Sequence, residues 1–562
     1  MDQRHKWMVT AKFEKRALLI AVNALAGMSI FFFGSSPTRP HVESYDQGMM
    51  GGVNNAKHYI DLMKFGYVNA DGTPVVTDTL LQGGIMSVFY LGTLIGCMVG
   101  GSIGDRFGRI KTIAIGALWG IFGASLQCTA MNSNWMICAR LLNGIGTGIL
   151  NGIVPVWASE LADYTSRGAF IAMEFTLNIF GVVVAYWLGY AVSFIDNGES
   201  AFRWRFPIAF QIIPLLFLLF GCFLFPESPR WLCKVGRDDE SLYILQRLRG
   251  THDGIAEAEL ADIKDVVRLE QSAEGTKYHH MLFGLKCGKL HTGRRVQLVI
   301  WLQIIQCWTG IAGITMYGPK SRVAIFSIAG FGPSKALWIS GLNNIFYMFA
   351  TLICVFTIDR IGRRWTLYWG SVAQGIAMFL VGGLSRGGLN ARAVGNDDIA
   401  NSWGAAAATM VFLYTFVFGA TWLTVPWLYP AEIFPLQVRA KGNAWGVVGW
   451  SIGNGTLTLV LPYIIGAINE NAMYIFAAIN VISIPIVWAL YPESNQRTLE
   501  EIDFLFAADS PWTWDAEKKF KELKAEHESR VGAVRAAVEG DLESKGENSS
   551  THVEKSSGSE IQ

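Results

Sequence analysis

Three ionisable residues stand inside long apolar runs of this sequence, where charged side chains are rare and costly. Asp46 lies in YDQGMMGG, Arg140 lies in ARLLNGIGTG, and Glu174 lies in FIAMEFTLNIFG. A carboxylate close to an arginine stays ionised, and it takes up a proton when the arginine moves away. No histidine lies in an apolar run, so a carboxylate is the expected proton carrier. These residues predict reversible proton binding, and the alternative is a purely structural Asp–Arg pair.

A second group of charged residues lies where apolar runs end, and each cluster occurs twice. The segment GDRFGR contains Asp105, Arg106 and Arg109, and the segment IDRIGRR contains Asp359, Arg360, Arg363 and Arg364. In two further matching segments a glutamate precedes an arginine by seven residues, as Glu160 with Arg167 and Glu432 with Arg439. Such residues can form ion pairs that break and re-form during a conformational change. The alternative is that they only mark helix ends and topology.

The elements that must hold these residues are transmembrane helices. Only 16% of the residues are charged and 51% are hydrophobic, whereas a soluble protein has about 25% charged residues. Apolar runs of about 20 residues recur, and each is long enough to cross a bilayer as a helix. We expect an all-α membrane protein with twelve spans, near 17–53 (interrupted), 80–102, 111–131, 135–158, 168–192, 206–225, 296–328, 336–358, 365–385, 405–429, 441–465 and 472–491.

Matching segments divide the chain into two similar halves of six helices. PVWASELADYTSRG from Pro155 recurs as PWLYPAEIFPLQVRAKG from Pro426, and PESPRWL from Pro226 recurs as PESNQRTLEEI from Pro492. The distribution of Lys and Arg places both termini and the linker in the cytoplasm. We expect an N-terminus (1–16), a first half (17–225), a linker (226–295), a second half (296–491) and a tail (492–562), disordered from about 506.

Five segments in order resemble motifs of the sugar porters of the major facilitator superfamily, closest to their fungal hexose and polyol branch. They are GGSIGDRFGRIK (Gly100–Lys111), ARLLNGIGTG (Ala139–Gly148), PESPRWL (Pro226–Leu232), DRIGRR (Asp359–Arg364) and PESNQRTLEEI (Pro492–Ile502). The resemblance covers the chain from about 17 to 505. It implies a binding site between two six-helix halves, alternating access, and a helical cytoplasmic domain, which the segment 226–295 fits.

The resemblance also implies roles for the ionisable residues. It matches Asp46 to the aspartate that carries the proton in proton-coupled members, and Arg140 to its partner. Glu174 is either a second proton-linked carboxylate or a residue on the helix surface. The repeated charged clusters match a network that locks the two halves while the cytoplasmic side is closed. We expect a proton-coupled importer of a sugar or polyol in a fungal plasma membrane; a nutrient sensor and an uncoupled facilitator are alternatives.

The family's sugar-binding residues are only partly present. Gln306 matches the first of two glutamines on the seventh span, and Trp427 matches a tryptophan that stacks on sugar. Trp308 and Asn454 are weaker candidates. Phe175, Cys307 and Ala312 stand where the family has amide side chains, and each lost amide weakens binding by about tenfold or more. The site is therefore less polar than a glucose site, or it fits another ligand.

One polar segment does not fit a membrane span, and motifs typical of enzymes are not found in the sequence. The segment SSPTRPHVES (35–44) would place polar groups inside lipid without partners, so we interpret it as a gene-model error, with a genuine insert as the alternative. No metal-binding, nucleophile–base or phosphate-loop pattern stands out, and GIGTGILNG is typical of close helix packing. We expect that the protein is not an enzyme and that it uses no cofactor and binds no nucleic acid. We expect a monomer that binds a sugar or polyol and protons within a lipid bilayer.

Overall fold

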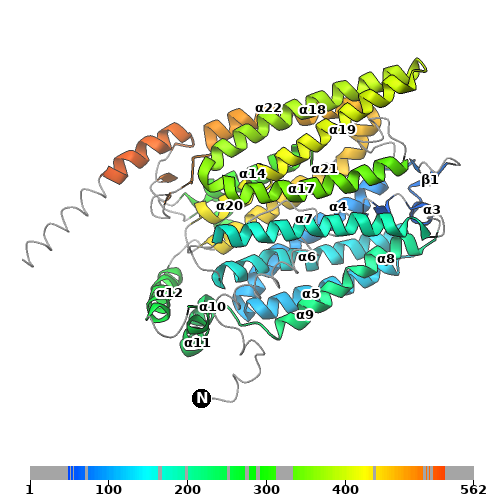
Figure 1. Cartoon of the computed structure of the whole chain (residues 1–562). Helices are drawn as coiled ribbons and strands as arrows, with labels where there is room; N and C mark the ends of the chain where they lie inside the picture. The colour runs from blue at the N-terminus through cyan, green and yellow to red at the C-terminus, as the bar shows by residue number, and fades with distance from the viewer. Residues whose placement is uncertain are drawn as a thin grey trace, which may run out of the picture.

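The computed structural model describes residues 49–50, 52–54, 56–69, 74–161, 167–195, 200–249, 254–272, 278–285, 291–311, 333–434, 438–495, 497, 502, 505–506 and 510–525. This part of the chain is mostly helical, and the long helices run side by side as a bundle (Figure 1). The expected all-α fold is confirmed. Asp46 and the segment 35–44 lie outside the described residues, as do the side chains of Arg167, Glu174, Asp359 and Arg439.

The first group of long helices covers the predicted spans from 80–102 to 206–225. It comprises α4 (Thr79–Phe107), α5 (Arg109–Cys128), α6 (Ser133–Leu161), α7 (Arg167–Val192), α8 (Phe202–Phe210) and α9 (Ile212–Cys222). The last predicted span is divided into α8 and α9. Pro214 near the start of α9 has no N–H to donate to the carbonyl of Phe210, which explains why the helix is interrupted at Gln211.

The second group covers the predicted spans from 296–328 to 472–491. It comprises α14 (Thr292–Trp308), α17 (Pro333–Ile361), α18 (Arg363–Ala393), α19 (Asp397–Ala420), α20 (Val425–Ile433), α21 (Arg439–Ile468), the 3₁₀ turn η5 (Asn469–Asn471) and α22 (Ala472–Leu490). Among the described residues, eight helical stretches are long and apolar enough to cross a membrane, and one of them runs through both α21 and α22.

Two helices extend well beyond their predicted spans. α18 continues to Ala393 rather than 385, and α19 begins at Asp397 rather than 405. The extensions are polar, and together they project from the bundle as a helical hairpin (Figure 1). Hydropathy marks only the part of a helix that lies in lipid, whereas the helix itself extends to its caps. Asn396 is the N-cap of α19, and its side chain accepts the backbone N–H of Ile399.

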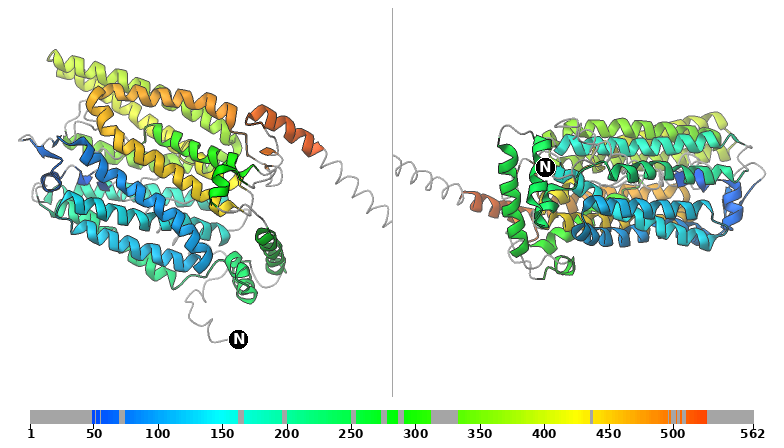
Figure 2. Two further views of the ribbon diagram at one scale, coloured as in Figure 1. Left: turned by 180° about the vertical axis from the view of Figure 1, so that it is seen from behind. Right: turned by 90° about the horizontal axis from the view of Figure 1, so that it is seen from below.

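Shorter elements lie at the two ends of the bundle. α10 (Pro229–Lys234), α11 (Asp238–Arg249), α12 (Ile255–Ser272) and α13 (Tyr278–Phe283) lie in the linker, and α10 to α12 share a small apolar core. They mark what we call the α10 end (Figure 2). α3 (Lys57–Met63) and the antiparallel pair β1 (Gly66–Val68) and β2 (Pro74–Val76), in which Tyr67 faces Val75, lie at the opposite end.

The two groups of helices meet mainly along two pairs of helices, and α6 also touches α21. α4 packs against α21, and α7 packs against α17. Within the first group, α4 and α6 approach closely because glycines face backbone: a side chain at Gly144 or Gly148 of α6 would clash with the α4 carbonyls of Phe89 and Thr93. The prediction that the glycine-rich segment serves close helix packing is therefore confirmed.

Candidate functional site

Gln306 and Trp427, predicted as substrate-binding residues, lie together in the second group of helices. Both side chains are fully buried, and the indole Nε1 of Trp427 donates to Oε1 of Gln306 at 3.2 Å. The Nε2 of Gln306 donates to the carbonyl of Trp422. The structure thus joins two residues that lie 121 positions apart in the sequence.

Prolines in α20 explain why α14 carries glutamines at this depth. A helix carbonyl normally accepts the N–H four residues later, and Pro426 and Pro430 have none to offer to Trp422 and Pro426. Gln306 donates to the first of these carbonyls, and Gln303, one turn earlier on α14, donates to the second at 3.1 Å. We did not predict Gln303; its spacing of three residues from Gln306 on a helix was the available signal.

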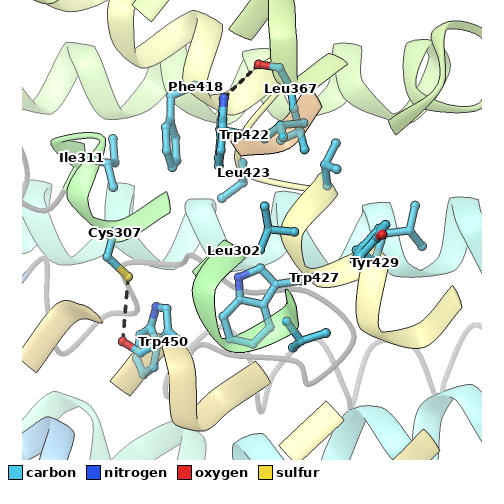
Figure 3. Close-up of a cluster of buried hydrophobic side chains, with 14 of the residues drawn as sticks. Leu302, Cys307, Ile311, Leu367, Phe418, Trp422, Leu423, Trp427, Tyr429 and Trp450 are labelled. Atoms are coloured by element: carbon cyan, nitrogen blue, oxygen red, sulfur yellow. Dashed lines mark hydrogen bonds between the residues drawn. The ribbon is translucent and has the colours of Figure 1, made fainter. Parts of the chain in front are cut away.

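Aromatic rings continue the site from Trp427 of α20 to Trp450 of α21 (Figure 3), and from there to α4. The rings of Trp427 and Trp450 meet edge to face with centroids 6.3 Å apart, and Tyr90 of α4 packs on Trp450 at 5.4 Å. The Nε1 of Trp450 and the Oε1 of Gln303 are buried and have no hydrogen-bond partner in the described part of the chain. A donor and an acceptor therefore remain available beside three aromatic rings.

The other predicted substrate residues lie near this site but differ in orientation. Trp308 is two residues beyond Gln306, which places it on another face of α14, and it is half-buried. Asn454 is buried one turn after Trp450 on α21. Cys307, which stands in place of an amide, is buried and its Sγ donates to the carbonyl of Trp450 at 3.8 Å. Its thiol therefore packs α14 against α21.

Arg109 is the centre of the charged cluster at the α10 end of the first group. Its guanidinium makes a two-pronged contact with Glu160, with Nε and Nη2 each donating to a carboxylate oxygen at 3.0 Å. Its Nη1 donates to Asp105 at 3.2 Å. Glu227, which begins the linker, accepts the backbone N–H of Arg109 at 2.9 Å and caps α5.

Burial shapes the electrostatics of Glu227. It raises the pKa of this carboxyl above the ordinary value of 4.5, while the backbone N–H groups of Ser228, Arg109 and Ile110 act in the opposite direction. Gly108 lets the carboxylate approach: its φ of 100° favours glycine, and a Cβ there would lie 2.6 Å from Oε2 of Glu227.

The second group repeats the arrangement with its own residues. Nη2 of Arg363 donates to Glu432 at 2.6 Å, and Nε donates to the same carboxylate at 3.1 Å. Glu493 accepts the backbone N–H groups of Arg363 at 2.9 Å and Arg364 at 3.0 Å, and thereby caps α18. Gly362, with a φ of 93°, takes the place of Gly108.

Each of these ion pairs joins residues of one group. Arg106 lies over the ring of Phe107, and Arg360 is exposed. Arg364 donates to Tyr368 and to the carbonyl of Trp488 on α22, and it reaches the C-terminal segment through the hydroxyl of Thr513. A lock between the halves stays a prediction. The two capping glutamates were not predicted as site residues, although both PES motifs that contain them were recognised as a repeat.

Arg140, the expected partner of Asp46, lies deep in the first group. Its side chain is 1% exposed, and its guanidinium carbon lies 5.1 Å from the centroid of the Phe89 ring. Phe89 precedes Tyr90, so Arg140 and the aromatic site are connected through neighbouring residues of α4. The structure therefore places this charge close to the surface where the two groups meet.

Comparison with known proteins identifies the family to which this chain belongs. The family model described as "Sugar (and other) transporter" matches residues 38–506. The chain belongs to this family. It is a member of the major facilitator superfamily, and the expected resemblance is confirmed. No part of this assignment depends on a single motif, because the match spans both groups of helices.

Individual relatives agree with the family. The sugar transporter STL1 of Saccharomyces cerevisiae is 29% identical over 517 residues, which cover 90% of this chain and 84% of that protein. The glucose transporter mfs1 of Aspergillus flavus is 29% identical and covers 81% of this chain and 87% of its own length. The proton:xylose symporter XylE of E. coli, with bound 6-bromo-6-deoxy-D-glucose, has a TM-score of 0.66 at 22% identity, over 87% of this chain and 99% of XylE.

Proposed function

We propose that this protein imports a sugar or polyol by alternating access, driven by a proton. The observation that supports it most is the buried set of Gln306, Trp427 and Trp450 at the meeting of the two groups of helices, in a chain of the sugar transporter family. Tyr90 contributes from the first group, so a ligand here would be held by both halves.

The ligand would exploit the groups that the protein leaves available. The indole N–H of Trp450 can donate to a hydroxyl oxygen, and the carbonyl oxygen of Gln303 can accept a hydroxyl hydrogen. The rings of Trp427, Trp450 and Tyr90 offer apolar surface to the C–H faces of a sugar. Gln306 is not one of these groups, because both ends of its side-chain amide bind protein atoms. This favours a small or only partly polar ligand.

Proton coupling would use Asp46 and Arg140, with Glu174 as a second carboxylate in the same pathway. The buried position of Arg140 beside Phe89 supports the proposal, since a buried guanidinium stabilises a nearby carboxylate only while the two are close. We further propose that the α10 end faces the cytoplasm, that the protein acts as a monomer in the plasma membrane, and that the Arg109 and Arg363 clusters hold the α10 ends of the halves in place.

The test is uptake of radiolabelled glucose, xylose and glycerol at pH 5 in yeast that lacks its own transporters. The full chain is compared with a chain that lacks residues 35–44, each with and without a protonophore. We expect uptake that the protonophore abolishes. Uptake that resists the protonophore would indicate a facilitator, and a chain that reaches the membrane without transporting any of the three would favour a sensor or another ligand.

A further inference from the structure

Three tryptophans form an exposed stack at the α10 end of the second group. Trp488 lies in the last turn of α22, and its ring meets that of Trp514 with centroids 5.2 Å apart. Trp512 stacks on Trp514 at 5.1 Å with an interplanar angle of 7°. We call these residues the tryptophan triad. Their side chains are 43–55% exposed, and three such rings in mutual contact form a continuous apolar patch of the kind that contacts lipid or another protein.

The segment that carries Trp512 and Trp514 is fixed to the bundle by other residues. The Thr513 hydroxyl donates to the carbonyl of Trp488 at 2.8 Å, and Arg294 donates to the carbonyl of Pro511 at 2.8 Å. Trp514 lies in the first turn of the helix 513–525, and Ala516 and Phe520 of the same helix are buried against the protein. These contacts attach the segment to the bundle, and the tryptophan rings lie on its exposed side.

The exposed triad continues the lipid-facing surface of α22. Val481 and Ile482 of this helix are 58% and 55% exposed, as an apolar residue is when it faces lipid. Trp488 is seven residues beyond Val481 and so lies on the same face of the helix. The helix 513–525 lies beside this end of α22 (Figures 1 and 2). The triad thus stands where the apolar surface of a spanning helix gives way to water.

We propose that the tryptophan triad is a docking surface for phospholipid at the boundary between headgroups and acyl chains, and that it seats helix 513–525 at the membrane surface. Tryptophan concentrates at this boundary because its ring is apolar and its N–H is polar. The exposed Lys518, Lys519 and Lys521 follow the triad, and they would lie among the headgroups. This inference depends on membrane insertion, and it is independent of the transported ligand.

The test uses the full chain in phosphatidylcholine nanodiscs that contain a trace of photoactivatable phosphatidylcholine with a diazirine near the top of one acyl chain. After illumination, lipid adducts are mapped by mass spectrometry. We expect adducts on the peptide with Trp512 and Trp514, at a yield similar to that on the peptide with Trp488. Adducts on Val481 and Ile482 are the internal standard for a correctly inserted protein.

Matched variants separate lipid contact from damage to the fold. Trp512→Ala with Trp514→Ala should reduce adducts on the C-terminal peptide several-fold and leave those on α22 unchanged, whereas the corresponding tyrosine pair should retain most of them. A wild-type chain with normal adducts on α22 but none on the peptide with Trp512 and Trp514 would overturn the proposal. So would protein–protein cross-links from the triad to a second copy in place of lipid adducts.

Discussion

Tyr90 and Trp450 belong to different groups of helices, and their rings meet edge to face with centroids 5.4 Å apart. One turn further along α4, the hydroxyl of Thr93 lies 3.1 Å from that of Ser451, the residue after Trp450. Both contacts join α4 to α21. Because Trp450 also packs on Trp427, the site and the surface between the halves share residues. A change in the angle between the halves would therefore alter the shape of the site.

Trp427→Phe should weaken substrate binding while leaving the fold intact. Phenylalanine retains an apolar ring but loses the N–H that donates to Gln306 at 3.2 Å, and the buried Oε1 of Gln306 loses a partner. We expect KM for uptake to rise by up to about tenfold, because the ring loses the hydrogen bond that holds it in place and such a bond contributes about 0.5–1.5 kcal/mol. Trp369→Phe, which changes a 63% exposed ring on α18, is the control. Equal KM values for the two variants would exclude a role for the Trp427 N–H.

Replacing Arg109 should destabilise the protein even where the positive charge is kept. Arg109→Lys keeps the charge but cannot make both contacts with the carboxylate. Arg109→Leu leaves Glu160 buried without its partner and should destabilise the protein by about 3–5 kcal/mol, whereas Arg109→Leu combined with Glu160→Leu should recover part of that loss. The stability of each variant is measured by thermal melting followed by size-exclusion chromatography. A double variant no more stable than Arg109→Leu would contradict this account.

The same comparison at Arg363 and Glu432 serves as an internal repeat. The contacts are of the same kind, with Nη2 of Arg363 at 2.6 Å from Glu432. The order of stabilities among the variants should match that of the Arg109 series. A different order would mean that the two clusters, although built alike, are not equivalent in the folded protein.

Glu227 should make the stability of the protein depend on pH. Burial raises the pKa of this carboxyl above 4.5, so the folded state holds the proton more tightly than the unfolded state. Its favourable contribution is complete below about pH 4.5 and is lost as the pH rises through the raised folded pKa. The melting temperature of the wild type, relative to Glu227→Gln, should therefore fall as the pH increases across this window. A difference that grows with pH would refute the assignment.

Gly144 and Gly148 should tolerate no side chain. A Cβ at either position meets a backbone carbonyl of α4, which cannot move aside as a flexible side chain would. Alanine at either site should destabilise the protein by about 1–3 kcal/mol or more. Gly189 of α7 has open space around it, and Gly189→Ala should be neutral or stabilise the helix by up to about 1 kcal/mol. Similar melting temperatures for all three variants would rule out close packing of α4 and α6.

The helices and their order could be predicted because a lipid-crossing segment must be apolar over a fixed length. The partners of the charged residues could not. Glu227 binds a backbone N–H 118 positions away, and no local pattern reveals that distance. Gln306 was predicted from resemblance, but its attachment to a carbonyl left free by Pro426 depends on the packing of α14 against α20. Similarly, Cys307 reads as a lost amide, and only the structure shows that it contacts Trp450.

The capping glutamates have a consequence for the ancestry and engineering of the chain. Glu227 follows α9 and returns to α5, while Glu493 follows α22 and returns to α18. In each half, the capping glutamate and the helix that it caps therefore belong to the same half, and these contacts do not involve the other half. If the two halves arose by duplication of a six-helix unit, the copy would have kept its own capping contact. Two polypeptides divided within the linker would likewise each retain a complete set, so that co-expressed fragments could reassemble without a covalent connection.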